Sequence, residues 1–70
     1  MFCYTGLWVI LAKKGMNKTD LRLAAKMGPA TLAKIGKDQP VSMEVLAKIC
    51  DCLGCDIGDI VRYMPEEGEV

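Results

Sequence analysis

Histidine is absent from this sequence of 70 residues. The chain therefore lacks the side chain that most often acts as a general acid, a general base or a metal ligand near neutral pH. No serine or cysteine stands beside a base that could activate it as a nucleophile, and there is no glycine-rich phosphate-binding motif. We therefore expect no enzymatic activity, no small-molecule substrate and no cofactor.

Long apolar runs are missing as well. The longest spans Leu7 to Ala12, which is much shorter than the ~20 residues that cross a bilayer and too short for the core of a signal peptide. Prolines number only three, hydrophobic residues make up 51% of the chain, and low-complexity segments are lacking. We expect a folded, soluble, cytoplasmic protein with no membrane partner, and at this length one domain of marginal stability.

Net charge is zero for the whole chain, but the charges are unevenly distributed along it. Residues 1–37 contain seven basic residues and one acidic residue, a net charge of +6, whereas residues 38–70 contain two basic and eight acidic residues, a net charge of −6. Such a separation is typical of a molecule with one side suited to a polyanion, although solvated helix faces can carry similar runs.

Helix signals fill most of the chain. Apolar residues at helical spacing predict a first helix from about Thr5 to Lys14, ending at Gly15. Asn17 is a favourable N-cap for a second helix, in which Asp20 lies in the first turn. We expect that helix to bury residues 21, 24 and 25 (Leu21, Ala24, Ala25).

The second half of the chain repeats these signals. Pro29 suits the first turn of a third helix, which should extend to about Gly36. After a polar loop at residues 37–40, Ser42 caps a helix with one apolar stripe (Val45, Leu46, Ile49, Cys50, Leu53) that ends at Gly54. A capping pair, Asp56 and Asp59, predicts a fifth helix from Ile57 to about Val61.

The two chain ends leave an alternative open. Arg62-Tyr63-Met64 can either continue the fifth helix or become extended and pair with Phe2-Cys3-Tyr4, and Pro65 ends both versions. Residues 66–70 are predicted to be an acidic flexible tail, which leaves residues 1–65 as a single domain. The expected fold is an all-α bundle of five helices with a possible two-stranded pairing of the termini.

Residues 17–61, NKTDLRLAAKMGPATLAKIGKDQPVSMEVLAKICDCLGCDIGDIV, resemble the small helix-turn-helix regulators of the Cro and phage-repressor type, the Xre-like family. The segments TLAKIGK and KICDCLGCDIGDI are the most specific part of this likeness, which covers nearly the whole chain. The resemblance implies a lambda-repressor-like fold and a DNA-binding transcriptional regulator. It also implies that the second and third helices form the helix-turn-helix pair, with the third helix in the major groove.

One position departs from the family pattern. A glycine usually ends the second helix in this family, but Lys26 falls at that place and Gly28 follows two positions later. If Gly28 were the turn glycine, the buried positions of the third helix would fall on Lys34 and Lys37, and burying unpaired ammonium groups is too costly. We therefore place Lys26 in the turn and turn Leu32 and Ile35 inward, which requires an unusual backbone conformation at Lys26.

This register defines a candidate DNA-binding surface. On the third helix and at its tip it contains Gly28, Pro29, Ala30, Ala33 and Lys34. Phosphate contacts are expected from Asn17, Lys18 and Thr19 at the start of the second helix, and from Lys37 and Gln39 after the third. Because that helix offers no Arg, Asn or Gln for a bidentate base contact, affinity should come mainly from phosphates.

A protein-interaction module with the same fold, similar to an antitoxin or an anti-repressor, is the alternative function. The small residues at the tip of the third helix favour it, because they offer little chemistry for base recognition. For the DNA-binding function we expect a homodimer on spaced half-sites, joined near the termini and the fifth helix.

Cysteines and aromatic residues suggest other kinds of site. Cys50, Cys52 and Cys55 could indicate zinc, but residues two apart on a helix point about 200° away from each other. We interpret the four cysteines as structural thiols and keep a metal site or a disulfide as alternatives. The aromatic residues near the termini are interpreted as core residues and not as a binding box (Phe2, Tyr4, Trp8, Tyr63).

Overall fold

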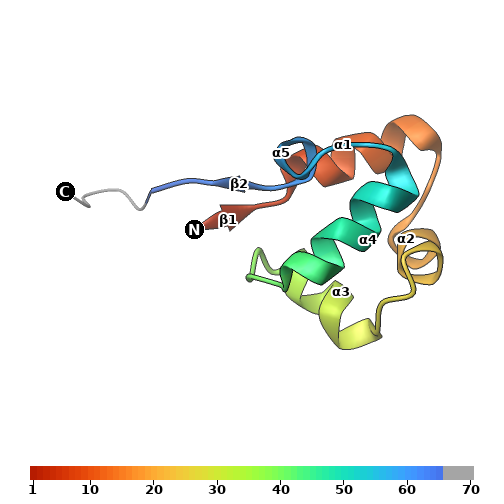
Figure 1. Ribbon diagram of the computed structural model, residues 1–70, viewed down its shortest axis with the longest axis horizontal. Coiled ribbons are helices and arrows are strands. Elements are labelled where there is room, and N and C mark those ends of the chain that lie inside the picture. Colours follow the sequence, from red (N-terminus) through yellow and green to blue (C-terminus); the bar gives the residue numbers. More distant parts are fainter. Residues whose placement is uncertain (66–70) are drawn as a thin grey trace.

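The computed structural model describes residues 1–65. Its elements are, in chain order, β1 (Phe2–Cys3), α1 (Thr5–Lys14), α2 (Lys18–Ala24), α3 (Pro29–Gly36), α4 (Met43–Leu53), α5 (Ile57–Ile60) and β2 (Arg62–Tyr63). Figure 1 shows α4 between α1 and α5 on one side and α3 on the other, with the two strands extending away from the helices. The predicted five-helix architecture is confirmed. The predicted acidic tail lies outside the described residues.

The helix ends form where local sequence chemistry predicts them. Asn17 and Asp20 form a capping box, in which the Asn17 side chain accepts from the Asp20 amide at 2.7 Å and Asp20 accepts from the Asn17 amide at 3.0 Å. Ser42 accepts from the amide of Val45 at 3.2 Å. Gly15 adopts the left-handed conformation that closes α1, with φ of 68°. These caps confirm the predicted end of α1 and the predicted starts of α2 and α4, and α3 and α5 lie within a residue of their predicted bounds.

The chain ends pair as an antiparallel two-stranded ribbon, which settles the alternative left open by the sequence. Phe2 pairs with Tyr63 and Cys3 with Arg62, and the rings of Phe2 and Tyr63 meet edge to face with centroids 5.4 Å apart. Beyond this pair the amide of Met64 donates to the carbonyl of Met1 at 2.8 Å. Tyr63 itself is 66% exposed, so its assignment to the core was wrong. Its ring packs edge to face against Phe2 on the ribbon and does not enter the helical core.

Apolar side chains from all five helices meet in one core, and no polar side chain of the described residues is buried with them. The core corrects one prediction for α2, since Ala24 is exposed whereas Ala25, the next residue, is buried. It also contains Met27, which no helical pattern had marked. The buried set comprises Tyr4, Leu7, Leu11, Leu21, Ala25, Met27, Ile35, Leu46, Ile49, Leu53 and Ile60.

Helices α1 and α5 approach each other too closely for a side chain at Gly6. A Cβ atom added there would overlap the backbone oxygen of Asp59 and lie 3.2 Å from its carbonyl carbon. The same atom would lie 3.7 Å from the Cα of Ile60, whose side chain is fully buried. Gly6 therefore allows the direct contact between the two backbones. Among residues 1–65, no helix is both long enough and apolar enough to cross a membrane.

Candidate nucleic-acid interface

The turn between α2 and α3 confirms the unusual backbone predicted at Lys26. Lys26 has a φ of 55°, and its exposed side chain stands where a left-handed residue closes α2. The amide of Met27 donates to the carbonyl of Arg22 at 3.1 Å, and the amide of Lys26 donates to that of Leu23 at 3.3 Å. These bonds form a Schellman-type helix end, in which glycine usually occupies the left-handed position.

Replacing Lys26 with glycine is therefore expected to stabilise the protein. A non-glycine residue in the left-handed region costs about 1 kcal/mol or slightly more, and glycine removes most of that cost at an exposed position. Urea denaturation followed by circular dichroism should give an increase of about 0.5–1 kcal/mol in the free energy of unfolding. A decrease of similar size in the free energy of unfolding would show that the Lys26 side chain stabilises the folded protein by more than its backbone strain destabilises it.

Helix α3 presents two different sides. Ile35 is fully buried and Leu32 is half-buried against the core, as the chosen register requires. Ala33 and Lys34 are exposed. The inward direction is thus fixed by two aliphatic side chains, and the opposite side of the helix is free to meet another molecule.

The tip of α3 is smooth and open. Gly28 is the N-cap with no side-chain cap, Pro29 occupies the first turn, and both are exposed together with Ala30. A Cβ added at Gly28 would meet nothing within 4 Å. The first residues of α3 therefore present only short side chains at an exposed position.

The loop after α3 is fastened to the start of α1. The hydroxyl of Tyr4, a residue that is only 1% exposed, donates to the carbonyl of Gln39 at 2.7 Å. Asp38 has a φ of 57° and accepts from the amide of Tyr4 at 3.4 Å. These contacts hold the loop that contains Lys37 and Gln39, both of which are exposed. Tyr4 thus positions one end of the candidate surface, a role that the sequence did not reveal.

Changing Tyr4 to phenylalanine is expected to destabilise the protein by about 1 kcal/mol, because the carbonyl of Gln39 loses its partner.

Burial raises the pKa of Tyr4, and Asp38 raises it further. The native state thus disfavours the phenolate, so this contribution to stability persists below the unfolded pKa of about 10 and is lost as pH rises above it. Denaturation at several pH values should show a smaller alkaline loss in the variant, and an equal loss would exclude Tyr4 as its source.

The start of α2 contributes three exposed residues to the candidate surface: Asn17, Lys18 and Thr19. The side-chain oxygen of Asn17 is already used in the capping box. The ammonium of Lys18 lies over the ring of Trp8, 4.8 Å from the centroid. The side chains of Asn17 and Lys18 thus already have partners within the protein, and the contact of Lys18 with Trp8 ties the start of α2 to α1.

The cysteines do not assemble a metal site in the described part of the chain. Within residues 1–65 no group of three or more cysteine, aspartate or glutamate side chains is arranged to hold a metal ion. Cys52 is exposed, whereas the other three thiols are half-buried, and all four are free.

Comparisons with known proteins point in the same direction as the geometry. The family model for Cro/C1-type HTH DNA-binding domains matches residues 6–66. An uncharacterized HTH-type transcriptional regulator, YozG of Bacillus subtilis (strain 168), is 36% identical over 61 residues, which cover 84% of this chain and 73% of YozG. The crystal structure of transcriptional regulator VanUg, Form II, is 43% identical, with a TM-score of 0.90 over 93% of this chain and 87% of that chain.

Proposed function

This chain belongs to the family of Cro/C1-type helix-turn-helix DNA-binding domains, and from that premise we propose that α3 enters the major groove of double-stranded DNA. The chain is accordingly a DNA-binding transcriptional regulator, a class of protein that is typically not enzymatic. The observation that supports the use of α3 is its two-sided burial. Ile35 is fixed in the core while Ala33 and Lys34 are exposed on the other side.

The proposed contacts divide into two kinds. At the tip, Gly28, Pro29 and Ala30 allow close approach to the groove, where alanine methyl groups can touch thymine methyl groups. Lysine ammonium groups supply the attraction to phosphates. The full proposed surface consists of Asn17, Lys18, Thr19, Gly28, Pro29, Ala30, Ala33, Lys34, Lys37 and Gln39.

Affinity on this proposal is mostly electrostatic. A surface that has lysines but no arginine, asparagine or glutamine on α3 makes few bidentate base contacts, each worth about 1–3 kcal/mol of discrimination. Binding should therefore weaken steeply with salt, because each neutralised phosphate releases counterions and contributes a slope of about −0.9 to log K against log salt.

Fluorescence anisotropy with random duplex and with genomic fragments, at two salt concentrations, tests the proposal. We expect a complex of micromolar affinity or tighter that weakens at the higher salt concentration. Selection of bound genomic fragments would then identify the operator. Absence of binding to any duplex at low salt, with the fold intact by circular dichroism, would contradict the proposal.

A protein-interaction module is the second candidate, and one observation favours it. The exposed tip at residues 28–30 has no side chain that can donate or accept a hydrogen bond. A protein partner could pack against such a surface as readily as DNA. Failure to bind duplex would support this function.

We also propose that the protein works in the cytoplasm as a homodimer, with residues 1–65 forming one domain. Several apolar side chains near the termini are exposed: Met1 by 57%, Val9 by 47% and Met64 by 52%. A two-stranded ribbon is marginally stable alone and has free edges, so a second copy would be a favourable cover.

Met64→Lys is expected to convert such a dimer into a monomer, since a charge would be placed among apolar side chains at the interface. Sedimentation equilibrium of the unmodified chain should give the mass of two chains, and that of the variant should give the mass of one. Leu23→Lys is the matched control, because Leu23 is also exposed, by 62%, but lies on α2. Dissociation by the control alone would place the interface elsewhere.

A further inference from the structure

The end of α4 brings two cysteines together. Gly54 is left-handed with φ of 66°, and its amide donates to the carbonyl of Cys50 at 2.8 Å. The amide of Cys55 donates to the same carbonyl at 3.2 Å. A bond from the residue after the left-handed glycine to the residue five positions earlier is the mark of a Schellman motif, which frequently brings the side chains of these two residues into contact. In this chain both of them are thiols. The Cys50 and Cys55 thiols are close enough to share a side-chain hydrogen bond.

The environment of the two thiols sets their chemistry. Both side chains are half-buried and packed against the core. Burial raises the pKa of Cys50, and the neighbouring Cys55 thiol raises it further. The raised pKa disfavours the thiolate of Cys50, whose sulfur lies close to that of Cys55 and is still partly open to small molecules in solvent.

We infer that Cys50 and Cys55 form a dithiol pair that a peroxide converts to an intramolecular disulfide. Because the raised pKa disfavours the thiolate of Cys50, the sulfur of Cys55 attacks the peroxide oxygen first. The O–O bond breaks, Cys55 becomes a sulfenic acid, and its thiol proton joins the leaving hydroxide to form the first water. The sulfur of Cys50 then attacks the sulfenic sulfur, its proton and the hydroxyl leave as a second water, and the S–S bond forms. Two electrons pass from the sulfurs to the peroxide, and a thiol reductant reverses the change.

The other two cysteines do not share this arrangement. Cys52 is exposed and lies two positions after Cys50 on the same helix, so it projects to a different side. Cys3 lies on β1, and a hydrogen bond with Thr5, at 2.9 Å, lowers the pKa of its thiol. Cys3 is thus open to oxidation on its own account and must be removed in a clean test.

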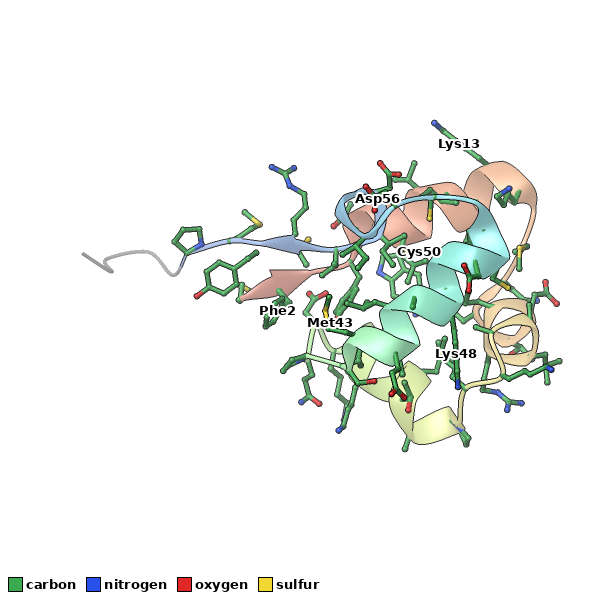
Figure 2. All side chains as sticks on the ribbon, in the orientation of Figure 1. Phe2, Lys13, Met43, Lys48, Cys50 and Asp56 are labelled. Atoms are coloured by element: carbon green, nitrogen blue, oxygen red, sulfur yellow. The ribbon has the colours of Figure 1, made fainter. Side chains whose placement is uncertain are left out.

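The dithiol pair lies at the junction of α4 and α5, away from the proposed DNA surface. Figure 2 shows Cys50 near Asp56, the N-cap of α5, while α3 lies on the other side of α4 from α5. A bond between Cys50 and Cys55 would fix the turn that joins α4 to α5.

The test uses the full chain with Cys3→Ser and Cys52→Ser, which leaves only the dithiol pair. After hydrogen peroxide, we expect loss of both titratable thiols and a mass lower by two hydrogen atoms, both restored by dithiothreitol. Cleavage after Lys48 and Arg62 should locate the lost hydrogens in the peptide 49–62. Oxygen adducts, a disulfide-linked dimer or two unreacted thiols would each overturn the inference.

The matched control is the chain with Cys3→Ser and Cys55→Ser, which keeps Cys50 and Cys52. It also has two thiols, but on different sides of α4, so we expect no intramolecular disulfide. Equal disulfide formation in this control would show that proximity in sequence, and not the Schellman turn, drives the reaction. If the first variant does not fold by circular dichroism, the peroxide-treated unmodified chain is alkylated and its peptide 49–62, which contains three cysteines, is fragmented. Alkylation of Cys52 alone supports the inference, and alkylation of Cys50 or Cys55 overturns it.

Discussion

Changing Lys34 and Lys37 together to glutamate is expected to weaken binding to double-stranded DNA by roughly one to two orders of magnitude at ~100 mM salt. Both lysines are exposed at the end of α3. The change removes two proposed phosphate contacts and puts negative charges against the polyanion. The slope of log K against log salt should also become less steep by about two units. Anisotropy titrations at several salt concentrations measure both effects.

Lys13→Glu with Lys14→Glu is the matched control for that experiment. It changes the net charge equally, but these lysines lie in the last turn of α1, and Figure 2 shows Lys13 pointing away from the side that carries α3. We expect the control to lower affinity only by the long-range effect of net charge, which salt screens. If both double variants bind DNA equally well, α3 is not the DNA-contacting helix. If only the control loses binding, the interface lies on α1.

Gly6→Ala is expected to destabilise the protein by about 2 kcal/mol or more, since an added methyl group must displace the α5 backbone. The overlap is with the backbone oxygen of Asp59, which cannot move without its helix. Displacing α5 would also disturb Ile60, which is fully buried. Urea denaturation should show a lower midpoint, with loss of the native near-ultraviolet signal at lower denaturant concentration.

Gly36→Ala provides the comparison. Gly36 also lies in a helix, but a Cβ added there meets nothing within 4 Å. Alanine should stabilise this position by about 0.5–1 kcal/mol through its higher helix propensity. If Gly6→Ala lowers the free energy of unfolding and Gly36→Ala raises it, Gly6 is needed for the close packing of α1 against α5. A Gly6 variant as stable as the unmodified chain would mean that α1 and α5 are further apart than described.

Helix boundaries were predictable from the sequence because they depend on local chemistry. Asn17, Ser42 and Asp56 each satisfy amides within three residues of their own position. The register of α3 followed from the cost of burying lysine, and the buried Ile35 confirms it. With that register, Lys26 must adopt an unusual backbone conformation in the turn, which its positive φ confirms.

Contacts between distant parts of the chain were harder to predict. Tyr4 reaches Gln39, 35 positions away, and no local pattern marks such a bond. Of the two alanines expected in the core beside Leu21, only Ala25 is buried, because it lies four positions after Leu21 on the same side of the helix and its amide donates to the Leu21 carbonyl at 2.9 Å. The DNA contacts themselves remain a prediction, because they depend on a partner molecule. What the sequence did identify is the exposed side of α3 on which they would form.

The ribbon has a consequence for how the protein reaches its native state. β1 and β2 lie far apart along the chain, and Met1 and Met64, which pair beyond them, are 63 positions apart. Contacts of this separation carry a large loop-closure entropy, whereas the helices form from neighbouring residues. The ribbon therefore closes last and opens first. Amide hydrogens at Phe2 and Tyr63 should exchange with solvent deuterium much faster than those of α4, long before the whole chain unfolds.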